Sequence, residues 1–250
     1  MNANKWIVVT GASSGIGLET THLLINNGYN VVATARNRET IENSLMKINS
    51  DNYCIIEWDL SNLDSLSEYA KIVNSRVGKI SGFVHCAGIQ QTIPISMITP
   101  ARINKIFAIN TFSAMVLVSL FSKKNYYLKD KTSFVLISSI ATMEGEPGNS
   151  LYSSSKGALE GFLLSSASEL MNKGIRINAV LPGMINCGMG KDFIDSISAE
   201  DKEKLIKSYP LGIGKTEDIS NFIEYLLSDK SKWISGQKFV LDGGHLVQKV

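Results

Sequence analysis

Cysteine, histidine and proline are all scarce in this chain of 250 residues, with three, three and five copies. An odd number of separated cysteines without a Cys-x-x-Cys pair argues against a disulfide framework and favours a reducing cytoplasm. The histidines are equally scattered, so no group of residues has the spacing of metal ligands, and we expect no metal site. The residues concerned are Cys54, Cys86, Cys187, His22, His85 and His245.

An excess of charge of one sign is also missing, because 25 basic residues face 23 acidic ones and the net charge is +2. We see no basic stripe that would bind nucleic acid through its phosphates, so we expect no nucleic-acid partner. Long apolar runs are missing too: residues 1–5 lead directly into a short run, and no later stretch looks able to cross a bilayer. We therefore expect a cytoplasmic protein without a membrane partner.

What the chain does contain is a regular alternation of short β-branched runs with helical patterns, and 44% of its residues are hydrophobic. Strands separated by helices indicate a parallel sheet, and right-handed crossovers place helices on both of its faces. The sequence therefore predicts an α/β, doubly wound fold with strand order 3-2-1-4-5-6-7, in one domain over residues 1–250. The predicted strands are Ile7–Thr10, Val31–Ala35, Cys54–Trp58, Gly82–Cys86, Phe134–Ser138, Ile175–Leu181 and Phe239–Leu241.

Residues of chemical interest follow these strands, at the carboxyl edge where doubly wound folds bind ligands. They are, after strands one to six in that order, Gly11, Arg36, Asp59, Gly88, Ser139 and Pro182. Residues 184–209 form the least regular stretch, with glycines followed by the charged, amphipathic segment Ser198–Lys207. We expect this stretch to be a substrate lid that carries a short helix.

The first strand ends in Thr10-Gly-Ala-Ser-Ser-Gly-Ile-Gly17, where the chain turns into a helix. Gly11 is expected to form the sharp turn, Gly15 to let the backbone approach a pyrophosphate, and Gly17 to let the helix pack close to the strand. Free N–H groups at the start of the helix then face the anion. The junction predicts a phosphate cradle formed by Gly11, Ser13, Ser14, Gly15, Ile16 and Gly17.

The residue after the second strand usually decides which dinucleotide is bound, because it lies beside the adenosine ribose. A carboxylate there binds both ribose hydroxyls, but this chain has Arg36 and then Arg38. A guanidinium offers a planar fork of donors that suits a phosphate dianion, so NADP(H) is preferred over NAD(H). The alternative is that Arg36 is a solvated arginine on a polar loop.

Tyr152 and Lys156 are four residues apart in a helical pattern, so they project from one face of the helix. A nearby ammonium favours phenolate and moves the pKa of a tyrosine toward the working range of an acid or base. Alone, such a pair more often marks an exposed helical face. Ser139, at the end of the fifth strand, can meet the phenol, and Asn110 lies in an apolar helical stretch where its amide must find partners or bend the helix.

These pieces together resemble the short-chain dehydrogenase/reductase family, and the resemblance covers nearly all of the chain. It implies a Rossmann fold that binds a nicotinamide dinucleotide, and an oxidoreductase that interconverts a ketone and a secondary alcohol by hydride transfer. The matching pieces are Thr10–Gly17, Asp59, Ala87-Gly88, Asn110, Ser139, Tyr152, Lys156, Pro182-Gly183, Gly236 and Asp242-Gly243-Gly244.

The resemblance also implies a role for each site residue. It makes Tyr152 the general acid/base, with Lys156 lowering its pKa and binding the nicotinamide ribose. It implies that Ser139 polarises the carbonyl and that Asn110 anchors a water that relays protons. The resemblance also implies that Asp59 and Leu60 lie near the adenine and that the backbone around Ile185 contacts the nicotinamide amide. The other residues that it implies for cofactor binding are Cys86, Ala87, Gly88, Pro182, Gly183 and Cys187.

Two positions depart from the family pattern. His85-Cys86-Ala87-Gly88 stands where the family commonly has Asn-Asn-Ala-Gly, and Cys187 stands where a threonine often occurs. A thiol gives weaker hydrogen bonds than an amide or hydroxyl, so both changes are expected to weaken cofactor binding without removing the acid/base groups. The two cysteines are either reactive thiols or small buried filler.

Within the family, the chain looks most similar to bacterial 3-oxoacyl-acyl-carrier-protein reductases, so the expected substrate is a small-molecule or acyl-carrier-bound carbonyl compound. Sugar, polyol and other secondary-alcohol dehydrogenases share the same elements and stay open. The segments that carry this likeness are Tyr209-Pro-Leu-Gly212, Glu217-Asp-Ile219 and Ile234-Ser-Gly-Gln237. The lysines that either dock an acidic carrier or are solvated charges are Lys123, Lys124, Lys129 and Lys173.

A function of another class also fits the fold, namely a non-catalytic NADP(H)-sensing or scaffold protein. Such a protein needs the glycine loop but not Ser139, Tyr152 and Lys156. Relatives usually form homodimers or homotetramers through the helices that bear Asn110 and Tyr152, so the same assembly is implied here. These helices contain more apolar residues than one buried face requires, and the additional ones are Met115, Val116, Phe162 and Leu163.

Overall fold

All of the predicted strands form, and they pair in parallel in the predicted order, β3-β2-β1-β4-β5-β6-β7. The structure is a computed structural model that describes residues 5–46, 48 and 50–248. Most of residues 1–5, which the sequence analysis placed before the first strand, lies outside the described residues. The strands are Trp6–Thr10 (β1), Asn30–Ala35 (β2), Tyr53–Glu57 (β3), Gly82–His85 (β4), Thr132–Ile137 (β5), Ile175–Pro182 (β6) and Lys238–Leu241 (β7).

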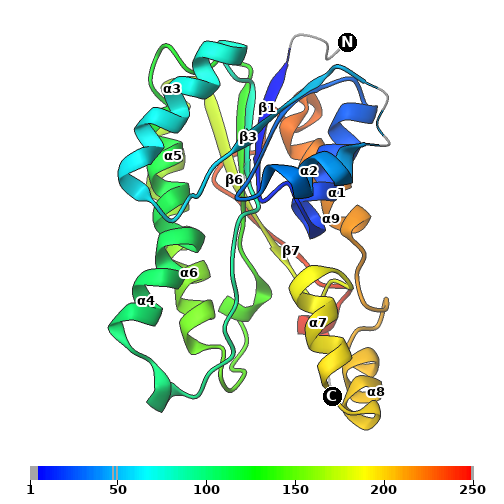
Figure 1. Cartoon of the computed structure of the whole chain (residues 1–250). Helices are drawn as coiled ribbons and strands as arrows, with labels where there is room; N and C mark the ends of the chain where they lie inside the picture. The colour runs from blue at the N-terminus through cyan, green and yellow to red at the C-terminus, as the bar shows by residue number, and fades with distance from the viewer. Residues whose placement is uncertain (1–4, 47, 49, 249–250) are drawn as a thin grey trace.

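Helices cover both faces of the sheet, as right-handed crossovers require (Figure 1). Successive side chains of a strand point to opposite faces, so Val8 joins the core under α3, α5 and α6, while Ile7 joins the core under α1, α2 and α9. The first group is Leu66–Val77 (α3), Ser113–Phe121 (α5) and Ser150–Met171 (α6). The second group is Gly15–Asn26 (α1), Arg38–Leu45 (α2) and Thr216–Leu227 (α9).

One long helical stretch contradicts the expectation that no segment of the chain is long and apolar enough to cross a bilayer. Residues Pro100–Phe121 comprise α4 (Pro100–Phe107), a π-helical turn (Ala108–Phe112) and α5, and their mean hydropathy of 1.5 over a membrane-length window would allow them to cross a bilayer. Length and composition are the only basis for that possibility. In this fold the stretch contributes to the core, because Leu117 and Phe121 of α5 are fully buried.

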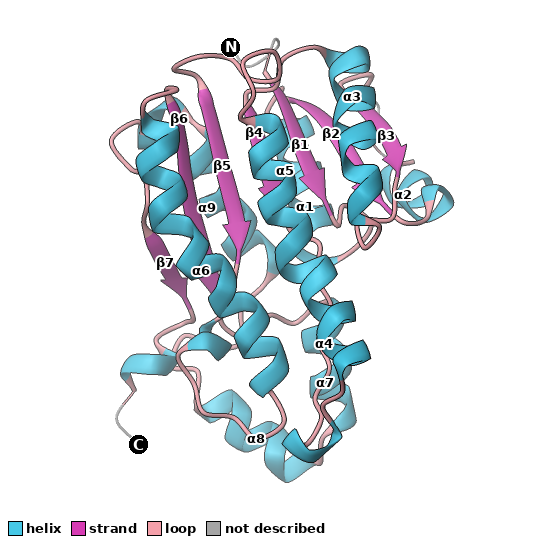
Figure 2. Cartoon of the chain, turned by 90° about the vertical axis from the view of Figure 1, so that its left-hand side faces the viewer, coloured by secondary structure: helices cyan, strands magenta, loops and turns pink. Residues whose placement is uncertain are grey.

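The carboxyl ends of the strands point toward one end of the molecule, where α4, α7 and α8 project beyond the sheet (Figure 2). The lid, residues 184–209, lies there and contains two helices, Gly188–Ser196 (α7) and Ala199–Lys207 (α8). Only α8 was expected, because Gly188 and Gly190 lower the helix propensity at the start of α7. Ser198 caps α8 by accepting the N–H of Asp201 at 3.1 Å.

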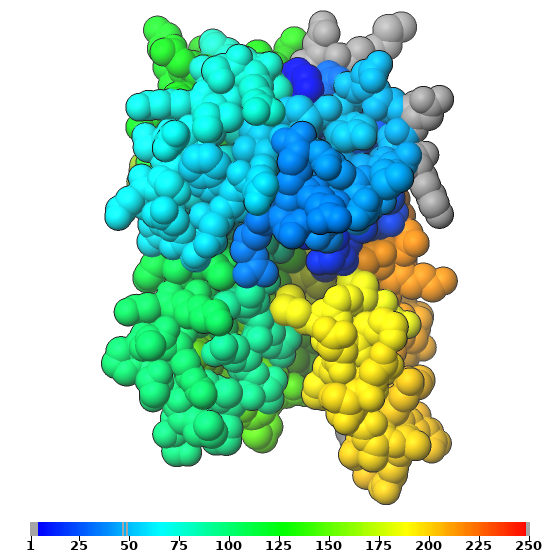
Figure 3. Space-filling view, viewed as in Figure 1, coloured from blue at the N-terminus to red at the C-terminus, as the bar shows by residue number. Residues whose placement is uncertain are grey.

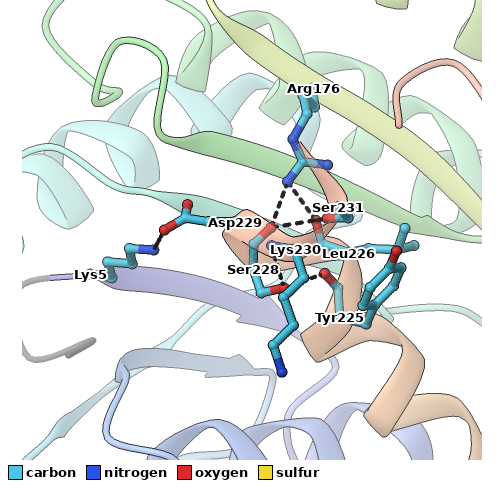
Figure 4. Close-up of polar contacts among 8 residues, drawn as sticks. All are labelled: Lys5, Arg176, Tyr225, Leu226, Ser228, Asp229, Lys230 and Ser231. Atoms are coloured by element: carbon cyan, nitrogen blue, oxygen red, sulfur yellow. Dashed lines mark hydrogen bonds and ion pairs between the residues drawn. The ribbon is translucent and has the colours of Figure 1, made fainter. Parts of the chain in front are cut away.

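At the opposite end of the sheet, Arg176 of β6 anchors the end of α9 (Figure 4). Its Nη2 donates to the carbonyl oxygens of Leu226 at 2.8 Å and Ser228 at 3.3 Å. Carbonyl groups at a helix C-terminus lack partners within the helix, and a cation there also complements the helix dipole. Lys5 pairs with Asp229 beside this contact at 3.2 Å. This end of the molecule therefore contributes to stability, away from the carboxyl edge.

The helices that bear Asn110 and Tyr152 carry some exposed apolar side chains, but Leu163, which the sequence predicted among them, is not exposed. Leu163 is fully buried, because it lies one helical turn from buried Leu159 and on the same side of α6. The expectation that it contributes to an assembly surface is therefore wrong. The exposed apolar side chains in the π turn and α6 are Phe112, Leu164 and Met171, with 40%, 64% and 59% of their surface exposed.

Candidate active site

The glycine loop is shaped by contacts that leave no room for a Cβ atom. Gly11 has a φ of +68°, and a Cβ there would lie 2.8 Å from the backbone nitrogen of Ala87. A Cβ on Gly17 would lie 2.2 Å from the carbonyl oxygen of Gly11, so α1 approaches the end of β1 this closely only because position 17 is glycine. The sharp turn and the close packing both match what the sequence predicts for these two glycines.

The first turn of α1 suits an anion. Ser14, which precedes the helix, makes no side-chain cap hydrogen bond, and α1, all of which is described, has no acidic residue in its first turn. The first N–H groups of a helix have no partner within it, and the helix dipole is positive there. A phosphate at this helix start would therefore meet no carboxylate, and the glycines place no side chain in its way. The cradle fits a pyrophosphate.

A cavity of about 930 Å³ joins this loop to the carboxyl ends of the strands and to the lid. Figure 3 shows the molecule hollowed between the lid, in yellow, and the green segments that face it. Every residue that the sequence predicted for the site lines this cavity except Asn110. The fold thus brings together residues that are up to about 180 positions apart in the chain, because parallel strands end at one edge.

Arg36 and Asp59 lie at the outer end of the cavity, after β2 and β3. Arg36 is exposed, and no carboxylate of the described residues forms an ion pair with it. Arg38, which the sequence suggested would add positive potential, instead pairs with Glu42 at 2.6 Å. Asp59 accepts the N–H of Ser61 at 2.9 Å. Arg36 is therefore better placed than Arg38 to meet a phosphate.

Tyr152 meets Ser139 inside the cavity, near the start of α6. Burial raises the pKa of the Tyr152 phenol, and a side-chain hydrogen bond with Ser139 offsets part of this rise. The Nζ atom of Lys156 lies 6.0 Å from the centre of the Tyr152 ring. Lys156 is not among the causes that set the Tyr152 pKa, so the expected lowering by its charge is not found in this structure.

Lys156 is itself buried, with 3% of its surface exposed. Its Nζ donates to the carbonyl oxygen of Ile137 at 2.7 Å. Burial lowers the pKa of Lys156 to about 8. A Cβ on Gly88 would lie 3.3 Å from this Nζ and 3.4 Å from the Oδ1 of Asn110, so glycine leaves the amine its space. The ammonium therefore lies in a dry environment where a small change in its surroundings changes its charge.

Asn110 is fully buried and acts as a cross-link. Its Oδ1 accepts the N–H of Ile89 at 2.8 Å, and its Nδ2 donates to the carbonyl oxygen of Ile89 and to the Oγ of Ser155, both at 2.9 Å. The surrounding π turn shows that the helix changes its geometry around the amide, as the sequence suggested. Both N–H groups of the side chain bond to protein, and the role of Asn110 in anchoring a water stays a prediction.

Two residues that the sequence reasoning missed complete this cross-link. Ser155 donates from its Oγ to the carbonyl oxygen of Tyr152 at 2.7 Å, and Thr111 donates to the carbonyl oxygen of Ser155 at 2.7 Å. Hydroxyl side chains in helices often bond to their own backbone, so nothing in the sequence distinguished these two. Together with Asn110 they attach α6, which carries Tyr152 and Lys156, to the π turn.

The thiols of Cys86 and Cys187 pack against the glycine loop. A Cβ on Gly17 would lie 3.2 Å from the Cβ of Cys86, and one on Gly15 would lie 3.4 Å from the Sγ of Cys187. Burial raises the pKa of Cys86 to about 12. Burial, with the charge of Glu217, also raises the pKa of Cys187. Protonated thiols are poor nucleophiles, so the interpretation as small buried filler is favoured over reactive thiols.

His85 links the end of β1 to the π turn. It is fully buried, with Nδ1 3.1 Å from the Oγ1 of Thr10 and Nε2 3.3 Å from the carbonyl oxygen of Ile109. Because a carbonyl only accepts, Nε2 carries the hydrogen and Nδ1 accepts from Thr10. Burial, followed by the charge of Lys156, lowers the pKa of His85 to about 3, so the ring is neutral.

The substrate side of the cavity is lined by the predicted lid, by the loop after β5 and by the turn after β7, which are far apart in the sequence. The sequence predicted the lid as a segment but not which of its side chains face the cavity, because only the fold brings these segments together. The lining residues include Glu144, Glu146, Met189, Phe193, Ser208, Tyr209 and His245.

Comparison with known proteins agrees with this geometry. A family model described as enoyl-(acyl carrier protein) reductase matches residues 11–245. The 3-oxoacyl-[acyl-carrier-protein] reductase FabG of Rickettsia felis is 32% identical to this chain over 246 residues, which cover 97% of each protein.

Solved structures give the same result. A short-chain type dehydrogenase/reductase from Mycobacterium ulcerans has a TM-score of 0.88 at 25% identity, covering 98% of this chain and 90% of that one. ElxO with NADP bound has a TM-score of 0.87 at 27% identity, covering 98% and 99%. A 4-hydroxyisoleucine dehydrogenase mutant complexed with NADH and succinate has a TM-score of 0.87 at 25% identity, covering 98% and 100%. The chain belongs to the short-chain dehydrogenase/reductase family of oxidoreductases.

Proposed function

We propose that this protein is an NADP(H)-dependent oxidoreductase that interconverts a ketone and a secondary alcohol by hydride transfer. The observation that carries the proposal is that Ser139, Tyr152 and Lys156 line the same cavity as the glycine cradle. An acid/base group beside a dinucleotide site is what carbonyl reduction needs. A sensor or scaffold protein would need the cradle without these three side chains.

The cradle residues support a nicotinamide dinucleotide as the cofactor, which supplies the hydride when it is bound. Gly11, Gly15 and the first turn of α1 would bind its pyrophosphate. Arg36, which forms no ion pair among the described residues, supports NADP(H) because its guanidinium can bind a 2′-phosphate. Among the structural neighbours, ElxO has NADP bound and the 4-hydroxyisoleucine dehydrogenase mutant is complexed with NADH. The preference for NADP(H) therefore rests on Arg36 rather than on the fold.

Tyr152 is the group that we propose moves the proton. Burial raises the pKa of its phenol, so the phenol is neutral at neutral pH and can donate its proton to the carbonyl oxygen during reduction. Ser139 can donate a hydrogen bond to the same oxygen. Burial lowers the pKa of Lys156 to about 8, so its amine can exchange a proton near neutral pH and return it to the phenolate that results.

For the substrate, we propose a 3-oxoacyl group carried on an acyl carrier. The relative from Rickettsia felis is named for that reaction, and the match covers nearly all of both chains. Met189 and Phe193 of the lid line the cavity and offer apolar surface to an acyl chain. A sugar or polyol is the second candidate, because the carboxylates of Glu144 and Glu146 line the same side and can accept hydrogen bonds from hydroxyl groups.

We propose a cytoplasmic homodimer or homotetramer as the assembled form. The π turn and α6 leave Phe112, Leu164 and Met171 exposed to 40%, 64% and 59%. Apolar side chains on neighbouring helices suit burial against a second copy of the same surface. Sedimentation of the purified protein measures the assembly directly, and a monomer at micromolar concentration would contradict it.

The function is tested by offering the purified protein a panel of ketones, including an acetoacetyl thioester and keto-sugars, with NADPH and with NADH. We expect NADPH oxidation with at least one ketone. Tyr152→Phe should lower kcat by about 10²- to 10⁴-fold while NADPH binding is kept, because only the proton donor is lost. Tyr53→Phe, in β3 away from the cavity, is the matched control. Tight NADPH binding without turnover of any ketone or alcohol would favour a sensor.

A further inference from the structure

His245 is the point where three segments of the substrate side meet. It lies in the turn His245–Val247 after β7, and its Nε2 is 2.6 Å from the Oε1 of Glu144. Its Nδ1 is 2.7 Å from the carbonyl oxygen of Ser208, and its ring stacks on Tyr209 with centroids 4.3 Å apart and planes at 12°. Glu144 lies five residues after Ser139, whereas Ser208 and Tyr209 end the lid.

The partners of the imidazole show that a proton is bound between His245 and Glu144. The carbonyl oxygen of Ser208 only accepts, so the Nδ1 of His245 must carry a hydrogen. The Nε2 atom faces a carboxylate, and two acceptors do not approach to 2.6 Å. A second hydrogen therefore lies on Nε2 or on Glu144, and either placement makes the contact a charge-assisted or strong neutral hydrogen bond.

Tyr209 extends this contact to the other end of the lid. Its hydroxyl accepts the N–H of Met184 at 3.0 Å, so the first and last residues of the lid are joined. A Cβ on Gly183 would lie 3.0 Å from the Tyr209 ring, which shows how closely the ring packs there. Tyr209 therefore joins the two ends of residues 184–209 through its hydroxyl and contacts His245 through its ring.

We propose that Glu144 and His245 form a latch that positions the substrate side of the active site. The latch holds the segment after Ser139, the closed ends of the lid and the turn after β7 at fixed distances around the place of the carbonyl substrate. Both residues act through other residues, so they are positioning residues and determine how tightly the substrate is bound. This inference rests on the proposed reduction of ketones at Ser139 and Tyr152.

Charged groups surround the latch, and they make His245 the favourable partner of Glu144. The other titratable and charged groups around the pair are Glu146, Asp242 and Tyr209. Burial raises the pKa of Glu144, and His245 offsets part of this rise. Glu146 and Asp242 raise it further, so His245 is the group that favours the carboxylate form of Glu144.

The latch is tested in the full chain with Glu144→Ala and His245→Ala. We expect the KM for a ketone to rise about tenfold while kcat changes little, because a charged hydrogen bond that positions the substrate wall is lost. Hydrogen-exchange protection of amides in residues 184–209 should fall in the same variants. The Kd for NADPH should stay unchanged, since neither residue lies at the glycine cradle.

A conservative variant separates the latch from a purely structural role. In Glu144→Gln the amide N–H can donate to the Nε2 of a neutral imidazole, so KM and lid protection should stay near the wild-type values. Glu203→Ala, which breaks an exposed ion pair with Lys207 of 2.7 Å within α8, is the matched control and should change neither quantity.

Two results would overturn the latch. The first is an unchanged KM together with unchanged lid protection in both alanine variants, and the second is a lid protection that falls equally in Glu203→Ala. If the wild type reduces no ketone, the proposed function fails, but the exchange measurements still decide whether the latch exists. Should either alanine variant fail to fold, the other alanine variant and the KM and lid protection of Glu144→Gln decide the question.

Discussion

At the cofactor end of the cavity, backbone packs against backbone, whereas at the substrate end, side chains from distant segments bond to one another. A Cβ atom on Gly17 would lie 2.2 Å from the backbone of Gly11, so only hydrogen fits there. Around His245 the contacts are a carboxylate at 2.6 Å, a carbonyl at 2.7 Å and a stacked ring. The backbone packing at Gly17 leaves no room for a side chain, whereas the contacts around His245 can be changed by substituting one residue at a time.

This difference explains how one fold can keep its cofactor chemistry while its substrates vary. Packing between backbone atoms has little room to relax, because Gly11 follows β1 directly and Gly17 lies in the first turn of α1. A contact between Glu144 and His245 depends on two side chains that other pairs could replace. We therefore expect the largest effects of substitution where backbone packs against backbone, and smaller, more selective effects where side chains make the contacts.

The largest effect is expected for Gly17→Ala. The added methyl group would lie 2.2 Å from a backbone oxygen, and overpacking of this kind costs about 3 kcal/mol or more of unfolding free energy. Urea unfolding and NADPH titration should both show the loss. Gly145→Ala, near the substrate end, is the matched control, because a Cβ there meets nothing within 4 Å. Equal stability of the two variants would contradict the comparison.

A smaller effect is expected at His85, which connects the cofactor end to the π turn. The pKa of His85 is lowered from 6.5 to about 3, so between these values the unfolded chain binds a proton that the folded chain does not. The stability is therefore present above pH 6.5 and is lost as pH falls, by about 1.4 kcal/mol per unit and about 2 kcal/mol at pH 5.

His85→Asn removes the group that titrates, so this part of the pH dependence should disappear from the free energy of unfolding. His22→Asn is the control, because His22 is only partly buried and should leave the acid slope in place. Urea unfolding at pH 5, 6 and 7 measures the slopes. If the slope of His85→Asn equals that of the wild type, another group causes the acid sensitivity.

The smallest effect is expected at the exposed rim of the cofactor end. Arg36→Asp should shift the ratio of NADPH to NADH affinity toward NADH by about tenfold, or about 1.4 kcal/mol, because a carboxylate repels the 2′-phosphate and binds ribose hydroxyls. Arg38→Asp is the control, since Arg38 is already paired with Glu42 at 2.6 Å. Competition binding of both cofactors measures the ratio, and no change in Arg36→Asp would remove the preference for NADP(H).

Features with a local pattern were predictable from the sequence. The strands formed within two residues of their predicted bounds, because β-branched runs between helical patterns have few other ways to bury their side chains. The turn at Gly11 and the close approach at Gly17 also followed from their spacing after β1. Tyr152 and Lys156 could be paired because helical periodicity places them on one face.

Features that depend on the surroundings of a residue were not predictable. The pKa of Tyr152 is raised rather than lowered, because burial outweighs the hydrogen bond with Ser139, and the Nζ of Lys156 lies 6.0 Å from the centre of the ring. Leu163 belongs to the core rather than to the outer face of α6. The amide of Asn110 is occupied by Ile89 and Ser155, which lie in other parts of the chain.

The sequence by itself determined the strands, the turn at Gly11 and the placement of Tyr152 and Lys156 on one helix face, because each depends on periodicity or spacing over a few neighbouring positions. Only the tertiary structure decided the partners of His85 and His245. Those partners come from segments that meet through the order of the sheet, and the neutral ring in one case and the bound proton in the other follow from burial and from the acceptors that surround each ring.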